Sequence, residues 1–195
     1  MKPLNGVANC HIEGVFSFVL NEDQRVFATR EWTTLGANDF GDVVGFHDHH
    51  RDLRIDVLLG EIVNLSASVA HEHSGESHPY PYAKWTWDST LRGGSGHFIR
   101  SHRSLPLRNR FIHTVLTPDT DTFRLDAADL HTIKQLTKVT AWMVTETSAS
   151  TQQPTVNWSR QDLTNWHSAH PDLYRPLTEK ELERVWRTLG LGKLV

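Results

Sequence analysis

Cysteine is almost absent from this sequence, because Cys10 is the only one among 195 residues. A single cysteine excludes an intrachain disulfide and a zinc site built from several thiolates. Structural disulfides mark oxidising compartments, so we expect a reducing, cytoplasmic location. Any metal site in this protein must draw its ligands from other side chains.

Long apolar runs and blocks of positive charge are missing as well. No segment reaches the ~18 apolar residues of a membrane-spanning helix, and the opening stretch MKPLNGVANC lacks the apolar centre of a signal peptide. The 20 Lys and Arg residues are scattered and are outnumbered by 23 Asp and Glu residues, for a formal net charge of −3. Nucleic acids and membrane surfaces attract basic patches, so we expect neither as a partner, and expect a small-molecule substrate instead.

Short strand-like segments, by contrast, are abundant. The polar turn NEDQ separates GVFSFVL from RVFATREW, which predicts a β-hairpin over residues 14–32. Further strands are predicted in DVVGFHDH, LRIDVLLGEIVNLSASV, RFIHTVLT, DTFRLD and KVTAWMVTET. Residues 71–96 are polar and rich in Gly, Ser, Pro and aromatic residues, which predicts a long loop outside the core.

A clear helical pattern is confined to the C-terminal tail. Thr178 and Glu181 have the spacing of a capping box, and Gly190 lies where a helix would end. The apolar stripe between them consists of Leu182, Val185, Trp186 and Leu189. Strands followed by a late helix predict a mainly β fold, with a β-barrel over residues 1–155 and a helical C-terminal extension over residues 156–195 packed on the same domain.

Histidine is the residue that stands out, with 13 in the chain and three within GFHDHH. His47 and His49 are two positions apart, and residues at this spacing project from the same face of a strand. Their imidazoles can therefore share one metal ion. His50 would project from the opposite face, towards solvent.

The context of this pair resembles the first motif of the cupin superfamily, and most of all that of thiol-dioxygenase-type cupins. A polar interval, the apolar strand IDVLL and the turn residue Gly60 follow the pair. FRLDAADLHTIKQLTKVTAWMVTE resembles the second motif, with a turn, one histidine and a returning strand. The resemblance, over roughly residues 40–146, implies a jelly-roll β-barrel with metal ligands His47, His49 and His131, and leaves His113 as the alternative to His131.

The chain departs from this pattern where many cupins carry a glutamate after the second histidine. Leu53 and Arg54 occupy those positions, and Asp52 lies one residue too early. Asp52 is therefore the candidate for a fourth ligand or for a group that supports the ligands. The resemblance also implies an arginine upstream of the first motif that binds a substrate carboxylate, and Arg30 lies in that region.

A second histidine cluster, HEHSGESH, contains His71, His73 and His78. His71 and His73 share the spacing of the first pair. They precede SGESHPYPY rather than an apolar strand, so no predicted core segment anchors them. We interpret this cluster as a polar loop near the mouth of a site.

Three imidazoles suit Fe, Ni, Cu or Zn, and three protein ligands leave coordination positions open for catalysis. The resemblance therefore implies a metal-dependent cupin enzyme, with Fe(II) as the expected ion and a dioxygenase reaction on a small organic substrate. Two alternatives stay open: a metal-dependent lyase or isomerase, and a non-catalytic cupin module that binds a small ligand or a partner. Exposed strand edges would also allow a homodimer.

Overall fold

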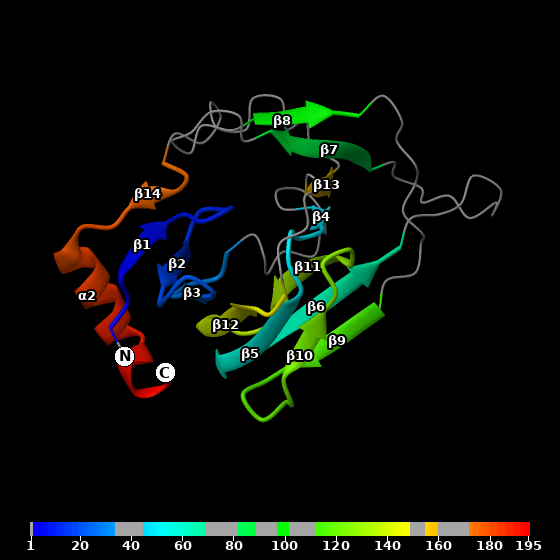
Figure 1. The fold of residues 1–195 in the computed structure, drawn as a ribbon. Coiled ribbons are helices and arrows are strands. Elements are labelled where there is room, and N and C mark those ends of the chain that lie inside the picture. The colour runs from blue at the N-terminus through cyan, green and yellow to red at the C-terminus, as the bar shows by residue number, and fades with distance from the viewer. Residues whose placement is uncertain are drawn as a thin grey trace.

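The fold is taken from a computed structural model, which describes residues 2–33, 45–68, 82–88, 97–101, 112–148, 155–159 and 172–195. Two antiparallel sheets of seven strands each form the body of the protein (Figure 1). No helix in the described part of the chain is long and apolar enough to span a membrane.

The first sheet contains the N-terminal hairpin and the strand that follows the histidine motif. Its strand order is β10 (Phe123–Leu125), β5 (Leu53–Leu59), β12 (Thr140–Glu146), β3 (Gln24–Thr29), β2 (Val15–Val19), β1 (Asn5–Ala8) and β14 (Arg175–Pro176). The predicted hairpin over residues 14–32 is confirmed, because β2 pairs with β3 from Val15 opposite Thr29 to Val19 opposite Arg25.

The second sheet contains the strands that carry two of the histidines. Its strand order is β8 (His97–Arg100), β7 (Ala83–Asp88), β13 (Val156–Ser159), β4 (Phe46–His47), β11 (Leu130–Gln135), β6 (Ile62–Ala67) and β9 (Ile112–Leu116). The chain crosses from the first sheet to the second at Gly60, whose φ is +71° and whose Cβ, if present, would lie 2.3 Å from the Val139 carbonyl oxygen. Glycine is therefore required at this turn.

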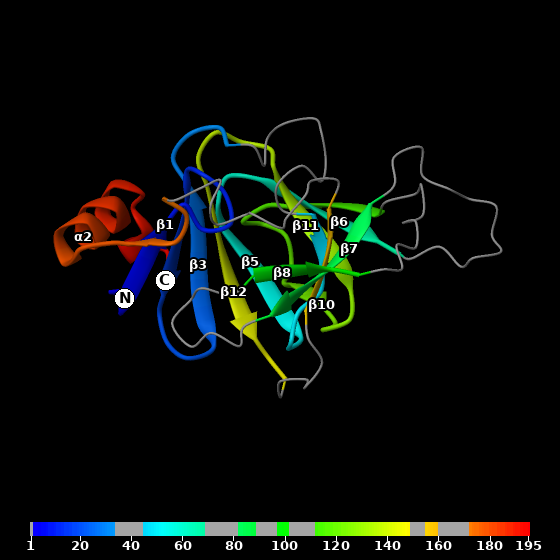
Figure 2. The same ribbon diagram turned by 90° about the horizontal axis from the view of Figure 1, so that it is seen from above.

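Apolar side chains join the two sheets at one end. Leu53, Ile55, Val57, Leu125 and Trp142 of the first sheet pack with Ile62 and Leu116 of the second. Seen from above, the two sheets face each other without closing into a continuous barrel (Figure 2). The predicted fold class, a mainly β jelly-roll barrel with a short helical C-terminal tail, is confirmed, although the two sheets do not close into a barrel.

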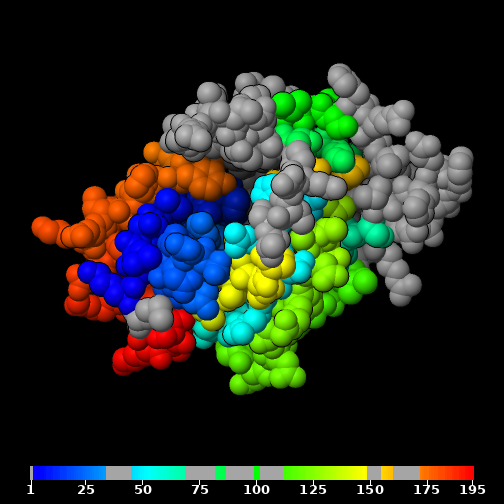
Figure 3. All heavy atoms as spheres, in the orientation of Figure 1, coloured from blue at the N-terminus to red at the C-terminus, as the bar shows by residue number. Residues whose placement is uncertain are grey.

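Helix α2 (Glu179–Thr188) covers the outer face of the first sheet, and the short 3-10 helix η2 (Leu191–Lys193) follows it. The capping box of Thr178 and Glu181 is formed as predicted, and Gly190 has the left-handed φ of +67°. The predicted stripe is buried against the sheet: Leu182, Val185, Trp186 and Leu189 pack with Phe18, Leu20, Val26 and Ala28. Figure 3 shows this tail beside the N-terminal strands on one flank of the molecule.

Two expectations about the later part of the chain need correction. Residues 71–96 are not wholly a loop, because β7 is a strand of the second sheet in which Trp85 is buried, and neighbouring Tyr82 is buried too. Residues 156–195 are not wholly helical, because β13 lies between β7 and β4, and β14 pairs with β1. The tail thus adds one strand to each sheet. The histidine cluster of residues 71–78 lies outside the described residues.

Candidate metal centre

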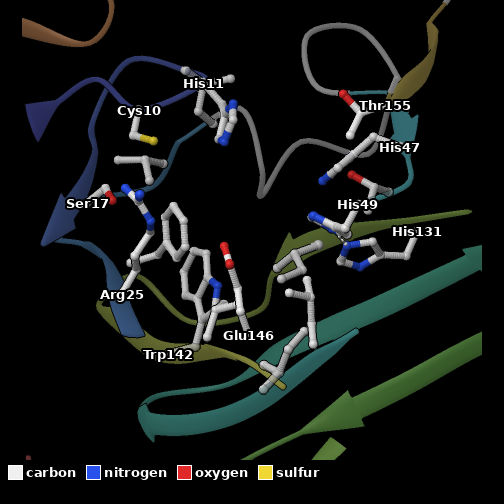
Figure 4. Close-up of a pocket in the computed structure, with 18 of the residues that line it drawn as sticks. Cys10, His11, Ser17, Arg25, His47, His49, His131, Trp142, Glu146 and Thr155 are labelled. Atoms are coloured by element: carbon white, nitrogen blue, oxygen red, sulfur yellow. Dashed lines mark hydrogen bonds between the residues drawn. The ribbon is translucent and has the colours of Figure 1, made fainter. Parts of the chain in front are cut away.

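A cavity of about 520 Å³ lies between the two sheets. Strand alternation decides which side chains line it. On β4, Phe46 is fully buried in a cluster with Tyr82 and Trp158, and the next residue, His47, faces the cavity. Residues from both sheets and from the N- and C-terminal segments contribute to its wall (Figure 4).

Three histidines converge on one side of this cavity. His47 of β4 lies directly opposite His131 of β11 in the sheet register, and His49 follows β4. Their ring centroids are 4.9 to 5.0 Å apart, and their ligand nitrogens all lie within 4.8 Å of one another. Among the described residues, no other group of His, Cys, Asp and Glu side chains has this geometry. The structure thus brings together the three predicted ligands, and the Nε2 atoms of His49 and His131 are only 2.7 Å apart.

Hydrogen bonds fix the tautomers of two of these rings. His131 Nδ1 donates to Asn64 Oδ1 at 2.7 Å, and Asn64 Nδ2 donates to Ser66 Oγ at 3.0 Å. His47 Nδ1 donates to the Gly45 carbonyl oxygen at 3.2 Å. Because a carbonyl-type oxygen only accepts, each Nδ1 carries the proton and each Nε2 carries a lone pair that faces the cavity. The lone pair of His131 Nε2 accepts a hydrogen bond from His49 Nε2 at 2.7 Å.

The protein environment keeps these imidazoles neutral. Burial lowers the pKa of His47 below its usual 6.5, despite the opposing hydrogen bond to Gly45. Burial, reinforced by the neighbouring imidazoles, lowers the pKa of His49 to about 2 and that of His131 well below 6.5. His131 is 3% exposed. Neutral imidazole is the form that binds a metal ion, so the donor set fits the predicted divalent metal.

Asp52 is hydrogen-bonded to the segment that carries His49. The backbone N–H of His49 donates to the Ala127 carbonyl at 2.9 Å, and the Ala127 N–H donates to Asp52 Oδ1 at 2.8 Å. The Asp52 N–H in turn donates to Ser148 Oγ at 2.8 Å. Asp52 neither belongs to the histidine group nor lines the cavity, so a fourth-ligand role is not supported.

Among the described residues, the arginine that lines the cavity is Arg25. Arg25 lines the wall opposite the histidines together with Cys10 and Ser17 (Figure 4), whereas Arg30 does not line the cavity, and both arginines are exposed to solvent. The carboxylate-binding role of Arg30 stays a prediction. His113, the alternative ligand, lies exposed on β9 and is not in the histidine group.

An apolar surface separates the two polar walls. The rings of Phe27 and Trp142 stack at 5.7 Å with an angle of 16°, and Ile55 and Val144 lie beside them in the lining. The Cys10 thiol stays protonated, because burial raises its pKa to about 12 in spite of a hydrogen bond to Ser17. Cys10 is therefore not a nucleophile at neutral pH.

The sequence analysis missed Arg25, His11 and Tyr174 as lining residues. None belongs to a periodic pattern or a spaced motif. One signal was available for Arg25: it shares the parity of Phe27 on a predicted strand, and Arg30 has the opposite parity.

Comparisons with known proteins give little beyond this. No protein-family model matches the chain, and no curated protein matches it. Among solved structures, it is similar to hydroquinone 1,2-dioxygenase from Sphingomonas sp. TTNP3, determined with 4-hydroxybenzoate bound. The identity is 11%, the TM-score is 0.31, and the match covers 67% of this chain and 64% of that one. The matched region is thus less than two thirds of that dioxygenase, and no functional argument is taken from it.

Proposed function

We propose that this protein is a metal-dependent enzyme of cupin type in which His47, His49 and His131 hold a divalent ion, with Fe(II) as the favoured ion. The observation that carries the proposal is the convergence of three neutral imidazoles on one wall of a cavity. Outward-facing Nδ1–H groups on two of them direct the Nε2 lone pairs inwards. When bound, Fe(II) supplies open coordination positions and the redox chemistry needed for a dioxygenase reaction.

The remaining lining residues favour a small organic acid as substrate. The Arg25 side chain forms no hydrogen bond or ion pair with the described residues, and it lies across the cavity from the histidines. A guanidinium group binds a carboxylate through two parallel hydrogen bonds. Phe27 and Trp142 would pack against the apolar body of the substrate and keep water away from it.

A second candidate is a metal-dependent lyase or isomerase. It is favoured by the Glu146 carboxylate, which lines the same cavity and is positioned by Arg51 Nε at 3.2 Å. A carboxylate of this kind can accept a proton from a bound substrate. Metal-dependent turnover without oxygen consumption would select this candidate, and ligand binding without turnover would indicate a non-catalytic module.

Metal analysis of purified protein tests the proposal. We expect close to one Fe(II), Co(II) or Zn(II) per wild-type chain after loading, and oxygen consumption by the Fe(II) form with small organic acids. His49→Ala should lose the metal, whereas His113→Ala and His73→Ala should keep it. Wild-type protein that retains no more metal than His49→Ala would contradict the proposal, and loss of metal only in His73→Ala would move the site to the second histidine cluster.

A further inference from the structure

A fourth histidine faces the candidate metal centre from the opposite side of the cavity. His11 follows Cys10 in the N-terminal segment, and its ring points into the cavity across from His47 (Figure 4). The ring centroids of His11 and His47 are 6.5 Å apart, compared with 4.9 Å between His47 and His49. His11 is therefore set back from the three ligands and does not belong to their group.

Tyr174, from the C-terminal segment, holds the His11 ring. Its hydroxyl oxygen lies 2.7 Å from His11 Nδ1, and the two rings meet edge to face at 5.6 Å. Burial raises the pKa of Tyr174, so its hydroxyl group keeps a proton that it can donate to His11 Nδ1. In this arrangement the proton of the neutral His11 ring is on Nε2, which faces the cavity.

The backbone around this pair is held in an uncommon conformation. The described part of the chain contains three non-glycine residues with positive φ: Asn9 at 56°, His11 at 66° and Tyr174 at 55°. Asn9 joins the two segments, because its carbonyl accepts from the Tyr174 N–H at 3.2 Å and its Nδ2 donates to the Asp172 carbonyl at 3.2 Å. Side chains held by strained backbone gather at functional sites, where the surrounding contacts impose the geometry.

We infer that His11, aimed by Tyr174, is a ligand-binding residue whose Nε2–H donates a hydrogen bond to an anionic or oxygen-bearing molecule bound at the three-histidine site. This inference rests on the proposed metal centre. It gives the N-terminal segment a direct part in ligand binding, and it gives the C-terminal segment a positioning part through Tyr174. The ligand class is a small hydrogen-bond acceptor that fits between His11 and the metal.

The test is a titration of azide, a small anion, into the Co(II)-loaded protein, followed by the visible absorption of the metal. His11→Asn removes the ring and retains a residue that tolerates positive φ. We expect its azide Kd to rise about tenfold, as for one lost hydrogen bond to an anion. Tyr174→Phe removes only the hydroxyl group and should raise the Kd by a smaller factor. His113→Asn, on the exposed strand β9, is the matched control and should bind azide as the wild type does.

The outcomes separate this inference from the proposed function. Wild-type azide affinity in His11→Asn with full Co(II) content would overturn the inference alone. Loss of Co(II) from His11→Asn would also overturn it, because His11 would then belong to the metal site itself. Wild-type protein that takes up no Co(II) would overturn both proposals. If His11→Asn does not fold, Tyr174→Phe decides, and an unchanged azide Kd in that variant counts against the inference.

Discussion

At the scale of single residues, the hydrogen bond between His131 and Asn64 decides which imidazole nitrogen faces the cavity. Asn64 is fully buried, and its Oδ1 lies 2.7 Å from His131 Nδ1. The partner that orients a metal-binding imidazole contributes to the affinity nearly as directly as the ligand itself. Asn64 is therefore the residue outside the histidine group on which metal binding should depend most.

The variant Asn64→Leu removes this acceptor and keeps a side chain of similar size. His131 then loses its fixed tautomer and orientation, so the affinity for Co(II) should fall about 10- to 100-fold. Competition with a chromophoric chelator measures that affinity. Asn21→Leu, at an exposed turn, serves as the control. Equal Co(II) affinities in the two variants would show that Asn64 does not position His131.

The same imidazoles make the stability of the metal-free protein depend on pH. Burial lowers the pKa of His47, His49 and His131 in the folded chain below the ordinary value of 6.5. Below pH 6.5 the unfolded chain takes up protons at these residues, whereas the folded chain stays neutral there. The unfolded state then binds more protons, so the free energy of unfolding falls as the pH falls.

We therefore expect the Tm of the metal-free protein to decrease between about pH 7.5 and about pH 5. Each histidine that stays neutral contributes at most about 1.4 kcal/mol per pH unit. The decrease should be smaller in His49→Gln, which lacks one of these groups, and unchanged in His113→Gln. Thermal unfolding over a pH series measures the slopes, and identical slopes in all three proteins would rule out His49 as a source of the pH dependence.

At the scale of secondary-structure elements, the position of His47 depends on a strand of two residues. β4 pairs with β11 on one side and with β13 on the other, where His47 lies opposite Asn157. Gly45 precedes the strand, and a Cβ at this position would lie 1.9 Å from the Trp158 carbonyl oxygen. Only glycine lets β4 approach β13 this closely.

Gly45→Ala should therefore push β4 away from β13 and displace His47. We expect a destabilisation of about 1–3 kcal/mol, as in other overpacked sites, together with weaker Co(II) binding. Chemical denaturation and chelator competition measure the two effects. Gly192→Ala is the matched control, because its nearest neighbour beyond the adjacent residues, Trp186 Nε1, lies at 3.4 Å. A Gly45→Ala midpoint equal to that of Gly192→Ala would show that the close approach is not required.

Two of the elements that were predicted from the sequence depend mainly on local contacts. The hairpin of β2 and β3 and the capped helix α2 depend on residues that are near in sequence, so their patterns were sufficient. β7 was missed because its burial depends on aromatic residues and on its pairing with β13, about 70 positions away in the chain. The two-residue strand β4 is too short to have a pattern of its own.

At the scale of the whole molecule, the cavity combines a predicted wall with an unpredicted one. The wall that carries the three histidines could be predicted from the spacing of His47 and His49 and from the motif context of His131. The opposite wall depends on which face of β3 is turned inwards. Val26 and Ala28 pack against helix α2, so Phe27 and Arg25 face the cavity. Both faces of β3 carry apolar residues, Val26 and Ala28 on one and Phe27 on the other, so the sequence alone does not say which face is turned inwards.

The choice between the two arginines gives a test of the whole cavity. If a substrate carboxylate binds at the wall opposite the histidines, Arg25→Leu should weaken the binding of small carboxylates such as benzoate to the Co(II)-loaded protein. The expected loss of affinity is at least about tenfold, since hydrogen bonds to a charged group are worth about 1.5–3 kcal/mol.

Arg25→Lys keeps the charge without the geometry for two parallel hydrogen bonds, and its affinity should fall between those of the wild type and Arg25→Leu. Arg30→Leu changes an exposed arginine outside the cavity and should leave the affinity unchanged. Calorimetric titration of the four proteins measures these affinities. Weaker binding in Arg30→Leu but not in Arg25→Leu would show that the carboxylate binds at Arg30, as the sequence predicts. It would also mean that ligands do not reach the inner face of β3.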